Sequence, residues 1–153
     1  MVLDDDMKRV VREQRLAYVA SVCPDGTPNL SPKGTTIVWD DEHLAFLDLH
    51  SPGTVANIES GNVVVEINVV DPIRRKGYRF KGPAEVFREG PRFEDIVRFF
   101  ETERSTDRRR INSTVLVSVE QAEPLVSPAY DDGTTEQTVE ERSLEMYGLA
   151  RRA

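Results

Sequence analysis

Residues 44–58, with the sequence LAFLDLHSPGTVANI, predict a strand that leads directly into a helix. The apolar run from Leu44 is typical of a buried strand. Ser51 followed by Pro52 is typical of a helix start, because serine caps helices well and proline fits the first helical position. The first amides of a helix have no partners within it, and the helix dipole is positive there. The sequence therefore predicts a phosphate site at residues 51–54.

This helix start can be interpreted in two ways, as a phosphate site or as an ordinary capped helix. Gly53 lacks a Cβ, so an anion could approach the backbone closely, and the hydroxyls of Ser51 and Thr54 could donate to it. Alternatively, Ser51 only caps the helix and Thr54 faces solvent, as expected at any helix start. Spacing alone leaves both interpretations open.

Residues 29–35, with the sequence NLSPKGT, form a second unusual stretch. A proline and a glycine inside a predicted strand indicate an edge, a bulge or a close approach of the backbone to a ligand. Lys33, between them, could bring a positive charge to a phosphate. The alternative is a bent barrel corner with an exposed lysine.

The rest of the chain predicts a mainly β fold with flanking helices. Alternating apolar residues predict six strands, at 16–22, 29–39, 44–50, 63–70, 78–86 and 113–121. Helical spacing and start signals predict helices at 3–14, 51–60, 93–100 and about 136–150. Because tight turns join consecutive strands, a parallel βαβ sheet is disfavoured, and a small antiparallel β-barrel is favoured.

The composition limits the classes of protein. A chain of 153 residues fits one domain, and the tail at about 124–153 is too short to fold alone, so we expect it to pack on the barrel or on a second subunit. The formal net charge of -7 makes nucleic acid an unfavourable partner. The single cysteine excludes an internal disulfide. No apolar run long enough to span a membrane and no secretory signal are present, so we expect a cytoplasmic protein.

Other clusters of reactive residues give weaker evidence for a functional site. Asp48, His50 and Ser51 suggest a hydrolase, but adjacency in sequence does not make a catalytic triad. His43 and His50 lack the close spacing of metal ligands, so no metal site is predicted. The basic residues at 74–76 and 108–110 are typical of solvated loops. Alternatively, Arg74, Arg75, Lys76 or Arg79 line a ligand groove and hold an anionic substrate or cofactor tail.

Four segments in this order resemble the pyridoxamine 5′-phosphate oxidase-like, FMN-binding split-barrel superfamily over residues 8–120. They are LAYVASVCPDGTPNLSPKG (16–34), LAFLDLHSPGTVANI (44–58), NVVVEINVVD (62–71) and GYRFKGPAEVF (77–87). The resemblance implies a six-stranded antiparallel split β-barrel. It also implies a homodimer with two flavin sites between the subunits.

The resemblance also implies positions for the cofactor-binding residues. The segment Ser31, Pro32, Lys33, Gly34 and Thr35 would border the isoalloxazine ring. Asp48, Leu49 and His50 match flavin-contacting positions, Ser51 matches the phosphate-binding serine, and Asn57 matches a helix position that is usually Asn or Gln. Many members carry Arg or Lys after the serine, where this chain has Pro52 and Gly53. Lys33 or Arg79 could replace that charge.

The activity implied is that of an FMN-dependent oxidoreductase, distinct from the vitamin-forming oxidase. Electrons would pass from a reduced nicotinamide or a small organic substrate through the flavin, and no residue is assigned as catalytic. Two alternatives remain open at this point. One is a flavin- or haem-binding protein without turnover, and the other is a reductase that uses the deazaflavin F420.

Overall fold

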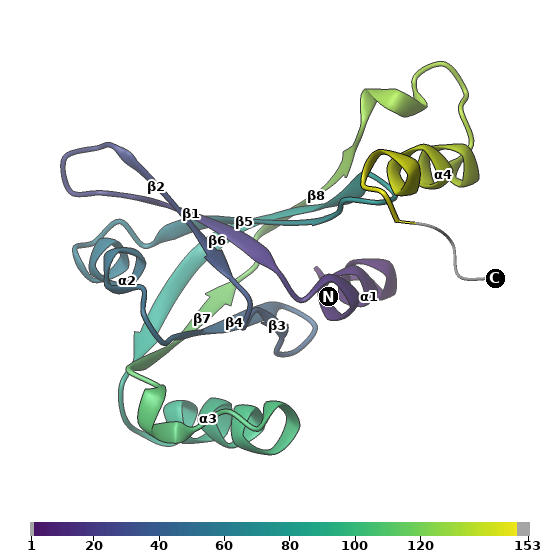
Figure 1. Cartoon of the computed structure of the whole chain (residues 1–153). Helices are drawn as coiled ribbons and strands as arrows, with labels where there is room; N and C mark the ends of the chain where they lie inside the picture. Colours follow the sequence, from purple (N-terminus) through teal and green to yellow (C-terminus); the bar gives the residue numbers. More distant parts are fainter. Residues whose placement is uncertain (1, 150–153) are drawn as a thin grey trace.

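Eight strands and four α-helices make up the computed structural model, which describes residues 2–149 (Figure 1). The strands are β1 (Ala17–Val22), β2 (Pro28–Lys33), β3 (Ile37–Val38), β4 (His43–Asp48), β5 (Val64–Asp71), β6 (Lys76–Phe87), β7 (Ser113–Ser118) and β8 (Gln121–Val126). The helices are α1 (Asp5–Gln14), α2 (Pro52–Glu59), α3 (Pro91–Arg104) and α4 (Glu136–Met146), with 3-10 turns η1 (Arg108–Arg110) and η2 (Pro128–Tyr130).

The long strand β6 joins the two halves of the barrel. All pairings are antiparallel, in the order β2-β1-β5-β6-β7-β4-β3, and β8 pairs with β6 outside this path. The first part of β6, up to Lys81, pairs with β8, and the part from Ala84 pairs with β7. β2 and β3, at the two ends of this order, do not pair with each other. The barrel is therefore open between them, which makes it a split barrel. The predicted fold class is confirmed.

The number of strands corrects the prediction of six. The predicted strand 29–39 divides into β2 and β3, because Gly34 and Thr35 turn the chain and the Thr36 amide donates to the Lys33 carbonyl at 3.4 Å. Residues 121–126, partly interpreted as irregular because of Pro124, form β8. Proline is tolerated there because β8 is an edge strand whose only partner is β6.

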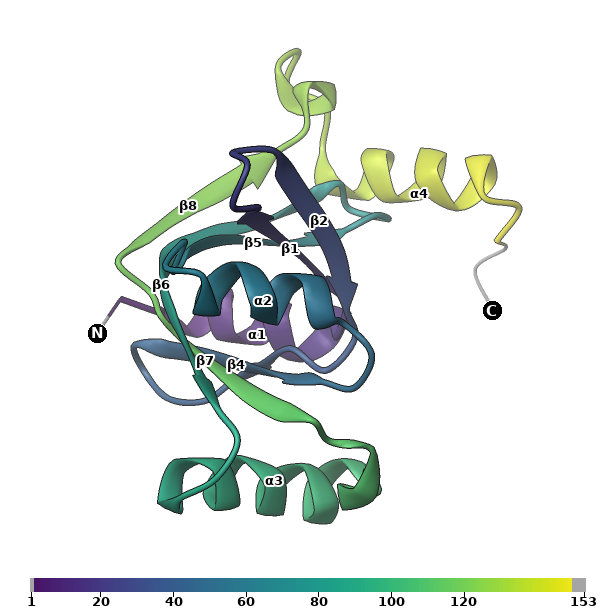
Figure 2. The ribbon, with the colours of Figure 1, turned by 90° about the vertical axis from the view of Figure 1, so that its left-hand side faces the viewer.

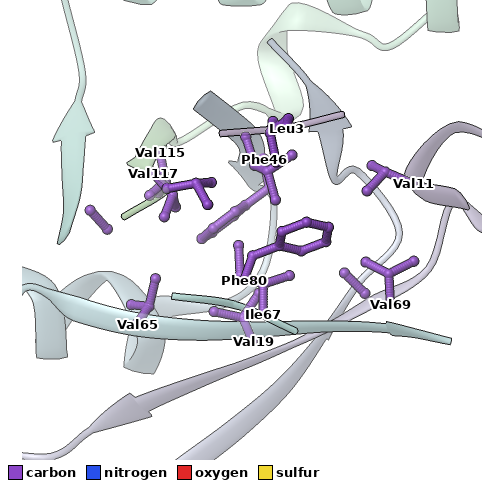
Figure 3. Packing of buried hydrophobic residues seen from close by; sticks show 14 of the residues in the cluster. Leu3, Val11, Val19, Phe46, Val65, Ile67, Val69, Phe80, Val115 and Val117 are labelled. Atoms are coloured by element: carbon purple, nitrogen blue, oxygen red, sulfur yellow. The ribbon is translucent and has the colours of Figure 1, made fainter. Parts of the chain in front are cut away.

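The interior of the barrel is apolar. Figure 3 shows side chains from both halves of the barrel meeting there, with Leu3 and Val11 added from the N-terminal segment. Phe46 of β4 and Phe80 of β6 are both 0% exposed and are the largest of these residues. A second cluster, which includes Leu47, Ile96 and Phe100, fixes α3 on the other side of β4.

The helices occupy different sides of the barrel. Asp4 caps α1, and Lys8 of that helix donates to Asp41 at 2.5 Å, which ties α1 to the turn before β4. α4 lies at the end of the molecule opposite α3 (Figure 1). α4 ends at Met146, and the predicted helix end near residue 150 falls outside the described residues. Among residues 2–149, no helix is long and apolar enough to cross a membrane.

Candidate functional site

The helix α2 lies beside the barrel, between the layer of β1 and β2 and the layer of β4 and β7 (Figure 2). Val55 and Ile58 join the core from its inner face. Asn57 is 4% exposed and donates to the Ser21 hydroxyl at 3.0 Å and to Cys23 Sγ at 3.6 Å. The amide of Asn57 therefore anchors α2 on β1 and fixes the direction of the helix start.

The start of α2 has unused hydrogen-bond donors. The Ser51 amide donates to Asp48 Oδ1 at 2.8 Å, but the Ser51 side chain makes no capping bond and has no hydrogen-bond partner within residues 2–149. The alternative in which Ser51 caps the helix is therefore wrong. A Cβ added at Gly53 would meet only Asn29 Oδ1, at 3.9 Å, so the backbone is open to a ligand. No residue of the first turn itself is acidic, and the nearest carboxylate at the helix start is that of Asp48, which occupies the Ser51 amide.

Thr54 does not face solvent. It is 1% exposed, and its hydroxyl is buried without a hydrogen-bond partner among the described residues. A buried hydroxyl without a partner is unfavourable, by about 1–3 kcal/mol. Thr54 thus lies at the predicted helix start, but its hydroxyl points into the protein.

Lys33 points into the barrel instead of standing on an exposed corner. It is 4% exposed, its Nζ donates to the Ser31 hydroxyl at 2.5 Å, and the same atom lies 5.9 Å from the centre of the Phe46 ring. Burial lowers the pKa of the Lys33 amine, and attraction to Asp48 opposes that shift. The Lys33 amine is therefore buried and bonded to Ser31, and its charge is attracted by the Asp48 carboxylate.

Hydrogen bonds bring the two predicted stretches together. The Leu47 amide donates to the Thr35 hydroxyl at 3.0 Å, so residues 31–35 run beside the end of β4. Pro32 and Gly34 are exposed there. Leu49 is half-buried, and its carbonyl accepts from Asn112 at 3.2 Å, whereas His50 is exposed.

The prediction from sequence missed two polar residues beside Asp48. Ser113 pairs with Asp48 across β4 and β7, is 0% exposed and has a hydroxyl with no partner in the described chain. Arg88 forms an ion pair with Glu59, which is the main cause of the raised pKa of its guanidinium, and the Asp48 carboxylate adds a smaller attraction. Strand pairing alone brings Ser113 to Asp48, so no local sequence signal could identify it. We call Ser31, Lys33, Asp48, Ser51 and Ser113 the mouth group.

Arg79 and the basic loop lie apart from the mouth group. Arg79 is on the outward face of β6, paired with Glu66 at 3.1 Å, and borders an outer cavity of about 180 Å³. Arg74 pairs with Asp71 at 3.0 Å, and Lys76 pairs with Glu136 at 2.8 Å. The positive charges of these three residues are thus paired with neighbouring carboxylates. The described residues contain no group of three or more His, Cys, Asp or Glu that could hold a metal ion.

An antiparallel barrel that is open between two end strands, with a helix start accessible beside it, defines the split-barrel class. The family model described as pyridoxamine 5′-phosphate oxidase matches residues 3–124, so the chain belongs to this family. The comparison with curated protein sequences found no match.

Solved structures support the same assignment. HupZ from Group A Streptococcus is 32% identical over 82% of this chain and 95% of that one, with a TM-score of 0.73. An FMN-binding protein from Syntrophomonas wolfei is 12% identical over 79% and 84%, with a TM-score of 0.64. HutZ, a haem storage protein from Vibrio cholerae, is 21% identical over 82% and 95%, with a TM-score of 0.62. The last two show the fold alone.

Proposed function

We propose that the chain binds FMN, with the phosphate at the start of α2. The observation that carries this proposal is the unused hydroxyl of Ser51 beside the open backbone at Gly53. Two features favour a phosphate there: the first-turn amides beyond Ser51, which have no partner within the helix, and the positive end of the helix dipole. Asn57 supports the site indirectly, because it holds the helix on β1.

The ring of the flavin would lie along residues 31–35 and the end of β4. Family membership and the hydrogen bond that joins Thr35 to Leu47 support this placement. A bound flavin supplies hydride and electron transfer. The residues of the chain would hold and tune it: the Lys33 ammonium favours negative charge nearby, Ser31 accepts a hydrogen bond from Lys33, and Asp48 accepts one from the Ser51 amide.

The protein would act as a homodimer in which the second copy completes the flavin site. The outward face of β1, β2 and β5 supports this proposal, because Leu30 is 65% exposed and lies beside Ala20 in the register, with Tyr18, Val22 and Val64 on the same face. An exposed apolar face of this kind marks an interaction surface. The second copy would also supply the phosphate-binding cation that Pro52 and Gly53 do not provide.

We further propose that the protein is a cytoplasmic oxidoreductase. Its small-molecule donor would be a reduced nicotinamide or an organic substrate. F420 remains an alternative cofactor, but two of the four cations proposed to hold its tail are paired with acids beside α4, and Arg79 is paired on the outward face.

A titration with FMN and with riboflavin tests the proposal. We expect FMN to bind and to be bleached by a reduced nicotinamide. Ser51→Ala should weaken FMN about tenfold, because a hydrogen bond to a charged group is lost, and should leave riboflavin unchanged because it lacks the phosphate. Ser60→Ala, at the other end of α2, is the matched control. No FMN binding, or equal losses for the two flavins, would contradict the proposal.

Haem binding is the second candidate. His50 is exposed, has no hydrogen-bond partner in residues 2–149 and follows the end of β4, and imidazole is the commonest axial ligand of haem iron. The other histidine, His43, is bonded to Asp40 at 2.7 Å. If haem is the ligand, His50→Ala should remove the absorption change on haem titration, whereas His43→Ala should not.

A further inference from the structure

Three consecutive cationic residues, Arg74, Arg75 and Lys76, lie at the turn between β5 and β6 and differ in their partners. Arg74 is paired with Asp71, Glu136 and Glu140, and Lys76 is paired with Glu136 and lies 4.4 Å from the centre of the Tyr130 ring. Arg75, between them, is exposed, and within residues 2–149 its side chain has no ion pair. Its backbone is left-handed, with φ of 55°. This conformation closes the hairpin between β5 and β6, where the Arg75 amide donates to the Asp71 carbonyl at 2.7 Å.

Arg75 borders two cavities between the sheet and α4. One has a volume of about 400 Å³, with Val70, Leu125 and Tyr147 among its other lining residues. The second has about 130 Å³, with Val139, Arg142 and Met146 beside Arg75. Arg75 lines both of these cavities. We call the two cavities together the α4 cavity.

The lining of the α4 cavity is positively charged and otherwise largely apolar. No Asp or Glu is among its lining residues, although the chain has 27 acidic and 20 basic residues. Arg142 has no ion pair in the described part of the chain. Its charge makes the smallest of the contributions that lower the pKa of Asp132. Met146 is 65% exposed and Tyr147 is 54% exposed, so apolar surface of α4 and the residue after it remains uncovered.

We propose that the α4 cavity binds a small amphipathic acid, which is an apolar or aromatic body with one carboxylate, sulfonate or phosphate group. The acidic group pairs with Arg75, because a guanidinium binds such oxyanions with two parallel hydrogen bonds. The body packs between Val70 and Leu125 on the sheet and Tyr147 beyond the end of α4. This site is separate from α2, which lies on the other side of the barrel from α4 in Figure 1.

A pair of fluorescent probes of similar shape tests the proposal. We would titrate the protein with 8-anilino-1-naphthalenesulfonate, which is anionic, and with N-phenyl-1-naphthylamine, which is its neutral analogue. We expect one sulfonate probe per chain and about tenfold weaker binding of that probe to Arg75→Gln, with no change for the neutral probe. Arg109→Gln is the matched control, because the Arg109 side chain is 90% exposed and lies on η1. Tyr147→Ala should weaken both probes, since it removes the apolar wall.

Four kinds of result would overturn the proposal. Equal binding of the two probes would show that no charge is recognised, and an unchanged affinity in Arg75→Gln would place the probe elsewhere. Displacement by saturating FMN, or loss in Ser51→Ala, would assign the probe to the proposed flavin site. Loss of binding as the protein self-associates would show that a second copy of the chain covers the cavity.

Discussion

Lys33 and Asp48 are two buried charged residues, and their opposite charges attract each other without forming a direct ion pair. Lys33 is 4% exposed and Asp48 is 6% exposed. Replacing water around two charges is unfavourable and is only partly compensated by their attraction. Neither residue is needed to fill the core, which Phe46 and Phe80 occupy. Two buried charges beside an open helix start are therefore better explained by ligand binding than by stability.

The lowered pKa of Lys33 predicts a dependence of stability on pH. The unfolded chain keeps the ordinary value of 10.5, so between the lowered folded value and 10.5 the unfolded state binds more protons. The free energy of unfolding of the parent protein should therefore rise with pH in that window, relative to Lys33→Met. Urea unfolding of both proteins from pH 7 to pH 10.5 measures this. Lys81→Met, on the exposed face of β6, is the control, and a constant difference between the parent and Lys33→Met would contradict the prediction.

For single residues of the site, the sequence could predict only features that depend on neighbouring positions in the chain. The capping signal at Ser51, the proline at 52 and the glycine at 53 are consecutive, so they identified the helix start. The burial of Lys33 and the approach of Ser113 to Asp48 depend on the pairing of Lys33 with Ala17 and of Asp48 with Ser113, which are 16 and 65 positions apart in the numbering. Local patterns contain no such information, which is why an exposed Lys33 remained an alternative.

The strand β6 depends on a glycine where it changes partners. A Cβ at Gly82 would lie 1.8 Å from the Ser118 carbonyl oxygen, which is backbone and cannot move aside. Gly82→Ala should therefore lower the free energy of unfolding by about 3 kcal/mol, the upper range for overpacking. Gly34→Ala, which meets no atom within 4 Å, should change it by less than about 0.5 kcal/mol. Urea unfolding compares the two variants. Equal changes in the free energy of unfolding would contradict the requirement for glycine at residue 82.

Helix α1 is held on β6 through a tyrosine. The Tyr78 hydroxyl donates to Asp6 at 2.6 Å, and this bond raises the pKa of Tyr78 to about 12. The neutral phenol is thereby favoured, so the stability it contributes is present below pH 10 and is lost as the pH rises from 10 to 12. Tyr78→Phe should lower the free energy of unfolding at pH 7 by about 0.5 kcal/mol, a low value because Asp6 is half exposed.

A phenolate absorbance titration checks the same bond. The step near pH 12 should be absent in Tyr78→Phe and present in Tyr18→Phe, which removes an exposed tyrosine of β1. If that step survives in Tyr78→Phe, the bond to Asp6 does not form in solution.

Most elements could be predicted because their signals are local. The proline at the start of α2, the apolar spacing within α3 and the alternation in β1, β5 and β6 were sufficient. β8 was missed because Pro124 indicates an irregular segment, and only its position at an edge makes proline acceptable. β3 was merged with β2, since the Gly34 turn resembles a bulge.

For the whole molecule, the outward face of β1, β2 and β5 is the most informative surface. Leu30 and Val64 are 65% and 48% exposed and lie on either side of β1, so an apolar strip crosses three strands. Beside it, the charges of β5, β6 and β8 include both signs: Glu66, Arg79, Lys81 and Glu123 line one cavity. A face with balanced charge can meet its own copy, as the symmetric interface of a dimer requires.

A charge placed in this strip should separate the subunits and disrupt the proposed flavin site together. Leu30→Lys adds an exposed cation on β2, so the fold of each chain should persist, but two such lysines would be buried across a symmetric interface. We expect light scattering to report a dimer for the parent protein and a monomer for the variant, with FMN binding at least about tenfold weaker because the second copy is lost. Asp95→Lys, exposed on α3, controls for the added charge and should remain dimeric. A monomer that binds FMN at full strength would show that one chain forms the whole site, and a Leu30→Lys dimer would place the interface elsewhere.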